Sequence, residues 1–546
     1  MMKSARRKNR VIEEEGRRPS RSLRADIVVP AAIALATFLV FSGTLRNGFL
    51  NWDDDLNFLN NPYYRGLGWA QLRWMLAAPH WGHYIPLTWL TLGLDFALWG
   101  MHPFGYHLSN LLLHCANAAV FYFVSRRLLA LAIPASPSSS PGWLELAAGS
   151  SALFFALHPL RVEAVAWVTA RRDVLFGFFY LLTVLFYLKA SADQTQRPRW
   201  LRMSVVCFGL SLLSKISGLT LPLALLVLDI YPLGRLPGDP KRWLSKATRQ
   251  VWLEKIPFIL MMLSAGLMGM SAMGRSGAML TMTKFSVTER LTQACFGLAF
   301  YVWKTFVPLR LSPLYSLFTL PNDRIDPWAA PFLISSMFVI LTTAGALAMR
   351  RRWPAGLAVW VCYVATVLPV LGLAQSGQQI AADRYMYAPS LGLAVLVAGS
   401  SARLWRDSGR RALSNAAMII AVLLAALSLL TWRYVKVWHD SESLWRRALD
   451  MDPAIASAHN NLGAALFGQG KLDEAIEHFD RALQLRPHYP SAHNNLGFAL
   501  AGQGRLDEAV RHYRQALLIN PQFAQARRNL EVVLQRSGPG THDLRR

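Results

Sequence analysis

Long apolar stretches recur along this chain, and they constrain its fold more than any other feature. A run of about 20 apolar residues can cross the hydrocarbon core of a bilayer as a helix. A helix also satisfies its own backbone hydrogen bonds there. We predict such spans at residues 25–45, 105–129, 146–166, 173–190, 200–214, 217–233, 253–273, 330–349, 354–373, 387–403 and 412–432. The pattern indicates an all-α, polytopic membrane domain over residues 25–432, with about eleven spans.

Two shorter stretches, Tyr84–Trp99 and Leu291–Val307, are ambiguous, and the second decides on which side of the membrane the C-terminal part lies. If Leu291–Val307 lies along the interface, every later basic cluster faces the cytoplasm, as the positive-inside rule requires. If it crosses, Arg350 to Arg352 face outward and the rule is broken. We therefore expect eleven crossings, a cytoplasmic N-terminus and an extracytoplasmic C-terminal part.

Both ends of the chain differ from the apolar part. Residues 1–24 are basic, with a short acidic interruption at Glu13 to Glu15, which predicts a disordered cytoplasmic arm. No small-residue cleavage site follows residues 25–45, so we expect a signal anchor that stays in the chain. Residues 537–546 are predicted to form a disordered tail.

The chain is strongly basic, with a formal net charge of +25. Such a charge often indicates nucleic-acid binding. Here, however, the basic residues gather in short loops and at both termini, where the positive-inside rule and anionic headgroups favour them. We therefore expect a membrane-embedded protein that binds no nucleic acid.

A repeat of 34 residues replaces the apolar pattern after Trp432. The matching positions are Asn460-Asn461-Leu462-Gly463 with Asn494-Asn495-Leu496-Gly497, Trp445 with Phe479 and Tyr513, Ala448 with Ala482 and Ala516, and Pro453 with Pro487 and Pro521. This period is typical of tetratricopeptide repeats, which stack helix pairs into an α-solenoid. We predict about two and a half to three repeats over residues 433–536, with a closing helix near 522–535. Such a solenoid offers a surface for peptides and has no catalytic chemistry of its own.

Three consecutive acids, Asp53, Asp54 and Asp55, follow the first apolar stretch. Carboxylates at a bilayer surface are costly beside an apolar protein unless they have a task. A helix end or a loop could also hold them without any task. The expected topology places all three on the outer face.

Polar residues near the ends of the apolar stretches form a second group of candidates. The basic members, expected on the outer face as a cationic pocket for a lipid phosphate, are Arg161, Arg171, Arg172, Lys215 and Arg384. Three others, which could orient a donor or only brace the fold, are His107, His158 and Glu163. No histidine pairs with a carboxylate at a recognised ligand spacing, so a metal site is not indicated.

Five segments, in order, carry a resemblance to a known family. They are Phe49 to Pro62, YIPLTWLTLGLDFALWGMHPFGYHLSNLLLH from Tyr84 to His114, LHPLRVEAVAWVTARRDVL from Leu157 to Leu175, LLSKISGLTLPLALLVLD from Leu212 to Asp229, and ADRYMYAPSLG from Ala382 to Gly392. The series resembles that of the TMTC family, the transmembrane and tetratricopeptide-repeat protein O-mannosyltransferases. The compact, Arg-rich form is similar to a bacterial member of that family.

The resemblance implies a GT-C glycosyltransferase that uses a sugar linked to polyprenyl phosphate as its donor. An acidic residue of the first external loop then matches Asp53 and Asp54, while Asp55 is an extra acid that leaves the choice of base open. Relatives often have an acid where this chain has Thr169-Ala170, before Arg171-Arg172. The resemblance also implies mannose as the sugar and a bacterial cytoplasmic (inner) membrane as the location. The acceptor is then a protein Ser or Thr, or an envelope glycan or lipid.

The chemistry of sugar transfer fits these residues independently. A carboxylate must deprotonate or orient the acceptor hydroxyl. Cations must hold the departing phosphate, which Arg or Lys can do without a metal. We predict Asp53 or Asp54 as the base, and as phosphate ligands Arg171, Arg172, Lys215 and Arg384. Inversion is expected at the anomeric carbon, because no second acid is evident as a nucleophile.

Two other classes of function fit parts of the sequence. A membrane-anchored repeat scaffold for envelope or pilus assembly would explain the tail, but it leaves the acids and the cations without a role. A transporter of a lipid-linked sugar would explain charged residues within spans. No internal duplication of spans supports it.

Overall fold

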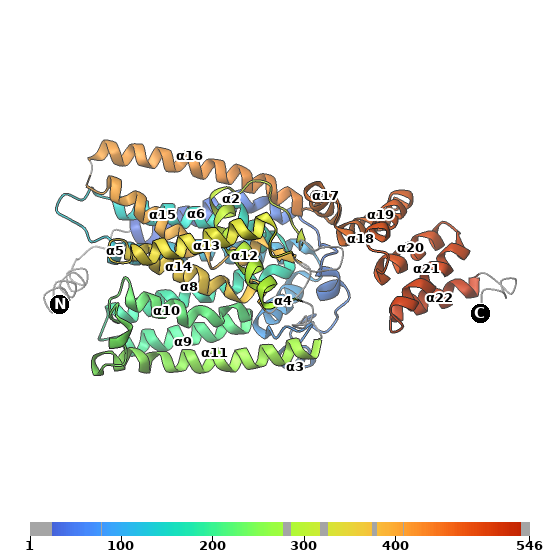
Figure 1. The fold of residues 1–546 in the computed structure, drawn as a ribbon, viewed down its shortest axis with the longest axis horizontal. Helices are drawn as coiled ribbons and strands as arrows, with labels where there is room; N and C mark the ends of the chain where they lie inside the picture. The colour runs from blue at the N-terminus through green and yellow to red at the C-terminus, as the bar shows by residue number, and fades with distance from the viewer. Residues whose placement is uncertain are drawn as a thin grey trace. The chain divides into compact units, whose positions relative to one another are not determined.

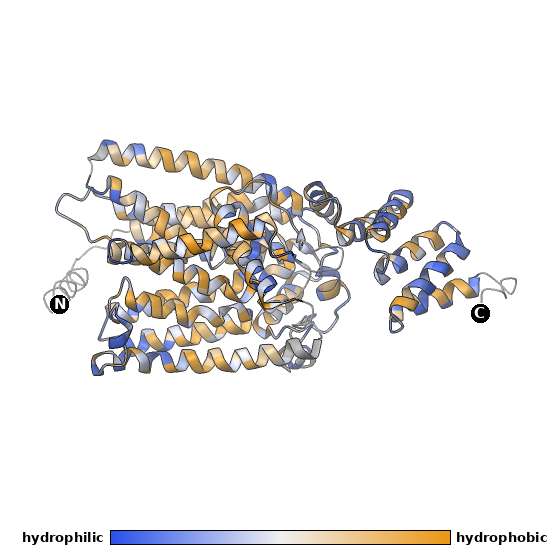
Figure 2. Cartoon of the chain, in the orientation of Figure 1, coloured by the Kyte–Doolittle hydropathy of each residue, from blue (hydrophilic) through white to orange (hydrophobic). Residues whose placement is uncertain are grey.

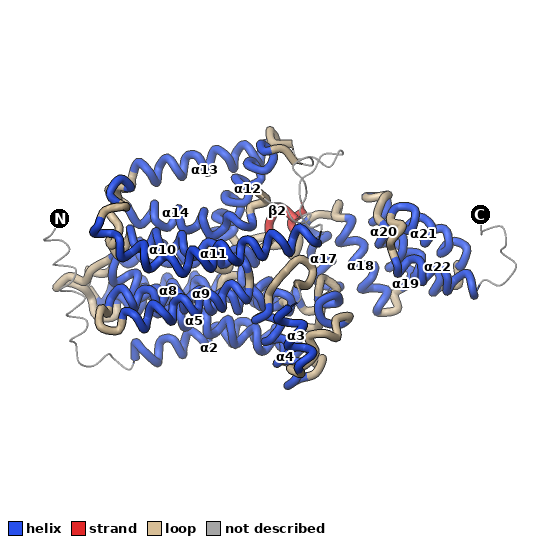
Figure 3. The backbone as a smooth tube through the Cα atoms, turned by 90° about the horizontal axis from the view of Figure 1, so that it is seen from below, coloured by secondary structure: helices blue, strands red, loops and turns tan. Residues whose placement is uncertain are grey.

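The computed structural model describes residues 24–77, 79–276, 285–316, 326–373, 379–407 and 409–536. The predicted disordered arm, apart from Arg24, and the predicted tail at 537–546 lie outside these residues. The described chain is helical apart from loops and two very short strands, β1 (Tyr315–Ser316) and β2 (Gln379–Ala381) (Figure 3). It divides into two compact units, and the first contains residues 1–46, 61–311 and 317–435 as far as they are described.

The first unit is a bundle whose long helices run roughly parallel to one another (Figure 1). Its α-helices are α2 (Val29–Phe41), α3 (Trp69–Ala77), α4 (Pro86–Trp99), α5 (Pro103–Ala132), α6 (Trp143–Ala156), α7 (Val162–Ala166), α8 (Arg171–Ala192), α9 (Arg197–Ser214), α10 (Leu221–Ile230), α11 (Arg249–Ser276), α12 (Val287–Phe306), α13 (Ala330–Ala348), α14 (Pro354–Val367), α15 (Ser390–Trp405) and α16 (Arg410–Val435). Short π or 3-10 turns are η1 (Arg24–Val28), η2 (Ser42–Arg46), η4 (Pro159–Arg161), η5 (Val168–Ala170), η6 (Ile216–Thr220), η7 (Pro240–Arg242), η8 (Lys246–Thr248), η9 (Leu368–Val370) and η10 (Asp383–Met386).

Apolar residues dominate these helices (Figure 2). Among the described residues, six helices are long and apolar enough to cross a membrane, at Ala25–Arg46, Pro103–Ala132, Val168–Ala192, Lys246–Ser271, Ala330–Ala348 and Arg411–Trp438. Shorter apolar helices lie at Trp143–Ala156, Ile216–Ile230, Pro354–Val370 and Ser390–Trp405. The chain is thus an all-α, multi-pass membrane protein, while the number of about eleven spans stays a prediction.

One expected span is interrupted. The stretch predicted as a single helix over residues 146–166 ends its helix, α6, at Ala156, and the chain is extended at His158. Pro159 lacks the N–H that would continue the helix. The Nδ1 atom of His158 instead accepts a hydrogen bond from the Leu160 N–H at 3.2 Å, which starts the turn η4. After this break the chain continues through η4, α7 and η5 before α8 begins at Arg171.

Buried polar contacts tie η10 to the centre of the bundle. The hydroxyl of Tyr387 accepts a hydrogen bond from Asn117 at 2.7 Å and lies 2.8 Å from Nδ1 of His114, and both of these residues are on α5. Asn117 also donates to the Val174 carbonyl on α8 at 2.8 Å. Buried hydrogen-bond networks of this kind favour one arrangement of the helices around them. The turn η10, which carries Arg384, is therefore held firmly against α5 and α8.

The second unit contains residues 47–60, 312–316 and the repeats from 436 onward. Its helices are η3 (Asp55–Leu59), η11 (Lys436–Trp438), α17 (Ser441–Met451), α18 (Ala456–Gly468), α19 (Leu472–Leu485), α20 (Pro490–Gly502), α21 (Leu506–Ile519) and α22 (Ala524–Arg536). The helices α17, α19, α21 and α22 each have one apolar and one polar face. The closing helix expected near 522–535 is α22.

In each repeat a glycine of the first helix packs against an aromatic ring of the second helix. A Cβ atom on Gly463 would lie 2.7 Å from the ring of Phe479, and one on Gly497 would lie 3.0 Å from the ring of Tyr513. The first helix of each pair must therefore lack a side chain where the aromatic ring of the second helix packs. Trp445, Phe479 and Tyr513 are all buried, as the 34-residue period predicts.

Candidate functional site: a cationic cleft in the first unit

A small cleft in the first unit contains two of the predicted cations. Its lining comes from the start of α8, the turn η6 with the residue before it, the end of α14 and the turn η10, and includes Asp173, Lys215, Thr366, Arg384 and Tyr385. Aromatic rings of Phe176, Tyr180 and Tyr387 form the apolar part of the wall. Charged side chains in a largely apolar cleft are the usual arrangement of a site that binds a ligand with a charged head group.

Lys215 lies at the break between α9 and η6, where the backbone is extended (φ −158°). Its ammonium forms an ion pair with Oδ1 of Asp173 and lies 5.6 Å from the centre of the Tyr385 ring. Burial lowers the pKa of Lys215 to about 8, the Asp173 carboxylate opposes this shift, and the nearby charges of Arg172 and Arg384 add to it. Oδ2 of Asp173 is buried and has no hydrogen-bond partner. The pair therefore keeps unused hydrogen-bonding capacity inside the cleft.

Arg384 pairs with Glu163 across the turns that follow α6 and precede α15. Nη1 of Arg384 contacts Oε1 of Glu163, and the Arg384 backbone N–H donates to Oε2 at 2.8 Å. The guanidinium also lies over the rings of Trp167 and Tyr385, at 5.3 and 4.8 Å from their centres. Its Nε is buried and makes no hydrogen bond. Glu163 thus orients Arg384, and one donor of the guanidinium stays unused.

Arg172 adds positive charge beside the cleft, although it is not one of the residues that line it. No ion pair between described residues involves Arg172, and its buried Nε has no hydrogen-bond partner. With all groups ionised, the three cations Arg172, Lys215 and Arg384 face two acids, Asp173 and Glu163. Arg172 is half-buried, and a cation without an acidic partner there favours an anion nearby. The cleft is therefore suited to a ligand that carries one negative charge.

His83 lies near the three cations, although it was not among the site residues expected from the sequence. It closes a tight turn in which Trp81 and Gly82 have positive φ angles and in which His80 and His83 exchange two backbone hydrogen bonds of 3.0 and 2.9 Å. Burial, together with the charges of Arg172, Lys215 and Arg384, lowers the pKa of His83 to about 3. His83 is thus a neutral donor or acceptor beside three cations. The sequence signal available was the histidine pair just before the shorter apolar stretch Tyr84–Trp99.

Two of the predicted phosphate ligands lie elsewhere. Arg171 is buried and bonded to Asp95, and Arg161 is buried against the rings of Phe155 and Tyr387 with its Nη1 donating to the Met386 carbonyl at 2.7 Å. The guanidinium of Arg171 is engaged by the protein, which opposes direct phosphate binding by Arg171 and gives it a bracing role. Nε of Arg161 is buried and has no hydrogen-bond partner, so the role of Arg161 as a phosphate ligand stays a prediction.

His158 and His107 also lie in buried positions. Both ring nitrogens of His158 have partners, since Nε2 lies 3.0 Å from the Thr305 carbonyl while Nδ1 accepts from Leu160. His158 therefore braces the loop, which is one of its two expected roles. His107 is buried within α5. Of the eight predicted donor-site residues, the structure brings together Lys215, Arg384, Glu163 and Arg172.

The three acids lie in the second unit, in the segment 47–60. Asp53 is half-buried and has a positive φ of 63°, whereas Asp54 is fully buried. Oδ2 of Asp54 accepts a hydrogen bond from the Leu50 N–H at 3.0 Å. Burial raises the pKa of Asp55, and the negative charge of Asp53 raises it further. Three adjacent acids therefore have three different environments.

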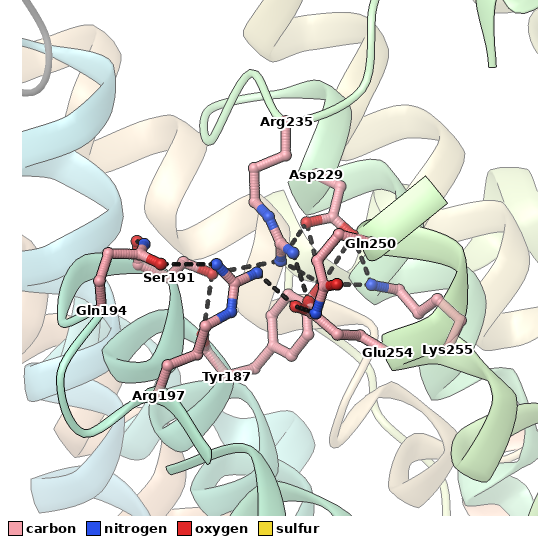
Figure 4. A network of polar contacts seen from close by, with 9 residues as sticks. All are labelled: Tyr187, Ser191, Gln194, Arg197, Asp229, Arg235, Gln250, Glu254 and Lys255. Carbon is pink, nitrogen blue, oxygen red and sulfur yellow. Dashed lines mark hydrogen bonds and ion pairs between the residues drawn. The ribbon is translucent and has the colours of Figure 1, made fainter. Parts of the chain in front are cut away.

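A second, larger cluster of charged residues lies outside the cleft (Figure 4). Asp229 accepts hydrogen bonds from Tyr187 and ion pairs with Arg235 and Lys255, and Glu254 pairs with Arg197 and Arg235. Its members contact one another, and none of them lines the cleft. The cluster therefore joins α8, α10 and α11. No group of three or more metal-ligating side chains placed for an ion occurs among the described residues.

Fold and site together define a multi-pass membrane protein that carries helical repeats and a cleft lined by Lys215 and Arg384. A model of the tetratricopeptide repeat family matches residues 454–522. Protein O-mannosyl-transferase Tmtc3 of Drosophila melanogaster is 27% identical over 450 residues, covering 72% of this chain and 48% of that protein. Protein O-mannosyl-transferase TMTC1 of Homo sapiens is 27% identical over 528 residues, covering 85% of this chain and 56% of that protein. The chain is similar to the TMTC protein O-mannosyl-transferases, which confirms the resemblance seen in its motifs.

Two further matches are shorter or lower in identity. Protein O-mannosyl-transferase TMTC2 of Homo sapiens is 35% identical over 156 residues, which is 28% of this chain and 17% of that protein. The crystal structure of ArnT from Cupriavidus metallidurans bound to undecaprenyl phosphate is similar over 94% of this chain and 89% of ArnT, with 14% identity and a TM-score of 0.37. This chain spans about half the length of the first curated relatives it matches.

Proposed function

We propose that this protein is a membrane glycosyltransferase. It transfers a hexose, mannose in our proposal, from a polyprenyl-phosphate donor to a Ser or Thr hydroxyl of a protein. The reaction takes place on the outer face of a bacterial inner membrane, where the repeats also lie, while the N-terminus is cytoplasmic. The names of the relatives support mannosyl transfer to protein.

The single observation that carries this proposal is the excess positive charge in and beside the cleft. A sugar linked to a polyprenyl phosphate is a phosphodiester with one negative charge, which matches the charge that Arg172 leaves uncompensated. Charge-assisted hydrogen bonds from Arg172, Lys215 and Arg384 would hold the phosphate in the donor and stabilise it as a leaving group. Tyr385 and Trp167, which lie beside Arg384, would flank the sugar or phosphate.

The acid segment, residues 47–60, contains the base in our proposal. We assign the base to Asp53, because Asp54 is buried and its carboxylate holds the loop through the Leu50 N–H. The acceptor oxygen forms a bond to the anomeric carbon while the bond from that carbon to the phosphate oxygen breaks. The hydroxyl proton passes to Asp53, and polyprenyl phosphate departs with the electron pair. One displacement inverts the configuration.

The test is transfer of radiolabelled mannose from dolichyl or undecaprenyl phosphate to a Ser/Thr-rich polypeptide by the purified protein in lipid nanodiscs. Asp53→Asn should lower kcat by about 10²-fold or more, as loss of a general base does, without lowering the amount of folded protein. Asp55→Asn is the matched control and should retain most activity. NMR of the product should show inversion.

Three outcomes would contradict the proposal. Folded Asp53→Asn and Asp54→Asn variants with unchanged transfer would exclude the acids as the base. A retained anomeric configuration would exclude a single displacement. A folded wild-type protein that transfers no sugar from either lipid donor would favour the repeat scaffold or the transporter.

A further inference from the structure

The acid segment is structurally a part of the repeat unit. Residues 47–60 cluster with the repeats, although they follow the first apolar helix in the sequence. The backbone N–H of Gly48 donates to the carbonyl of His439, just before α17, at 2.9 Å. The segment therefore rests on the first repeat helices and joins their fold.

Asn51 makes the central contacts of this docking. Its backbone N–H donates to Oγ of Ser441 at 2.9 Å, and its side-chain amide donates to the Asn461 carbonyl at 2.8 Å. The indole Nε1–H of Trp445 donates to Oδ1 of Asn51 at 2.6 Å. One side chain thus bonds to both α17 and α18.

Trp52 adds an aromatic contact beside Asn51. Its ring stacks on that of Trp438 with centres 6.2 Å apart and planes 14° apart, and it packs obliquely on Trp445 at 5.3 Å. Aromatic pairs of this kind contribute about 0.5–1.5 kcal/mol each beyond the area that they bury. Asp53 follows directly after this anchored pair of residues.

A chain of amide hydrogen bonds continues from the docking point through the repeats. The bonds join Asn460 to Asn461, Asn495 to Asn460, Asn494 to Asn495 and Asn529 to Asn494, at 2.9–3.3 Å. Asn461, Asn495 and Asn529 recur every 34 residues. The helices α18, α20 and α22 are therefore tied into one body together with the acid segment.

Asp53 needs this support. A non-glycine residue with φ near +60° is strained, by about 1–2 kcal/mol for the left-handed conformation, and such conformations persist where the surroundings hold them. The Asp53 carbonyl accepts from the Asn57 N–H at 2.8 Å, and Leu50 N–H binds Asp54. Local bonds close the loop, and the contacts of Asn51 and Trp52 fix its entry.

We propose that the first repeat is part of the catalytic apparatus, with Asn51 and Trp445 as positioning residues that hold the carboxylate of Asp53 in its working geometry. This inference rests on the proposed function. It assigns the repeats a second task besides binding a polypeptide, because a polypeptide acceptor bound on the repeats is held by the same body as the base. Small displacements of a base lower the rate of the chemical step, by up to about 10²-fold for 1 Å.

The sequence itself provides a matched test. Trp445→Phe introduces the residue that the next repeat has at the same position, Phe479, so repeat packing is kept while the hydrogen bond to Asn51 is lost. Tyr513→Phe, at the same position one repeat later, removes a hydroxyl far along the solenoid and serves as the control. Asn51→Ala removes the same contact from the side of the acid segment and leaves the repeat sequence intact.

Two measurements are made on each full-length variant in nanodiscs. Hydrogen exchange should become faster over residues 47–60 in Trp445→Phe and Asn51→Ala, and stay unchanged over 454–522. The kcat for sugar transfer should fall about tenfold or more while the KM for the lipid donor stays the same. The Tyr513→Phe variant should change neither quantity.

The outcomes separate this inference from the function on which it rests. A wild-type protein without transferase activity would end the proposed function. An active wild type with normal kcat in both Trp445→Phe and Asn51→Ala would overturn the positioning role, whether or not exchange changes. A rise in donor KM with unchanged kcat would also overturn it, because the contact would then serve donor binding.

Discussion

Nη2 of Arg171, the first residue of α8, lies 2.6 Å from Oδ2 of Asp95 on α4, and both side chains are almost fully buried, with 1% and 5% of their surface exposed. The same nitrogen donates to the Tyr106 carbonyl at 2.8 Å, and Oδ1 of Asp95 accepts from Ser109 at 2.6 Å. This buried ion pair ties α4, α5 and α8 together near the cleft.

Removing one partner of that pair should destabilise the membrane unit. In Arg171→Gln the Asp95 carboxylate stays buried without its counter-charge, which costs about 3–5 kcal/mol. We expect a lower thermal midpoint of the detergent-solubilised protein, measured by intrinsic fluorescence. The double variant Arg171→Gln/Asp95→Asn should recover much of the loss. Normal stability of Arg171→Gln together with a raised donor KM would restore the predicted role of Arg171 as a phosphate ligand.

Arg172 should behave in the opposite way although it is the next residue. Its charge has no acidic partner among the described residues, so Arg172→Gln should leave the thermal midpoint unchanged or slightly raised. Loss of one charge-assisted hydrogen bond, about 1.5–3 kcal/mol, should weaken donor binding by roughly 10- to 100-fold. Binding of a fluorescent undecaprenyl phosphate measures the change. Arg172→Lys, which keeps the charge, should lose much less affinity.

The contrast between Arg171 and Arg172 shows what a single sequence can predict. The basic pair at the start of a span indicated a cationic site, and the cleft contains Lys215 and Arg384 as expected. The division of labour within the pair depends on whether an acid from another helix reaches it, and Asp95 lies 76 residues earlier. Pairing at such separation follows from tertiary packing, which spacing and hydropathy do not encode. The break at His158 was missed for a simpler reason, because the apolar run continues through Pro159.

The pH dependence of donor binding should reflect Lys215. Burial lowers its pKa to about 8, so the ammonium is present below this pH and is lost as the pH rises through 8. Affinity for undecaprenyl phosphate should therefore fall between about pH 7.5 and 9. Lys215→Arg should remove most of this fall, because a guanidinium stays protonated over the range. An identical pH profile in the wild type and in Lys215→Arg would exclude Lys215 as a donor ligand.

The sequence predicts the repeats but not the docking of the acid segment on them. The 34-residue period predicted the helix pairs and the buried residues Trp445, Phe479 and Tyr513. These features depend only on the spacing of residues within one repeat. The docking of residues 47–60 on the first repeat joins Asn51 to Trp445 across 394 residues. Asn51 and Trp52 have no periodic pattern of their own, so only the folded chain shows why they precede the acids.

Lys255, in the second charge cluster, should give a signature opposite to that of Arg172. It is fully buried and bonded to Asp229 and to the hydroxyl of Tyr187 (Figure 4). In Lys255→Met, Arg235 remains 3.1 Å from Asp229, but the other carboxylate oxygen loses its cation. We expect a loss of several kcal/mol in unfolding free energy and an unchanged donor KM, since the cluster lines no part of the cleft.

The double variant Lys255→Met/Asp229→Asn should be more stable than Lys255→Met alone, because the uncompensated carboxylate is gone. A raised donor KM with normal stability in Lys255→Met would assign this cluster to the donor path and not to helix packing.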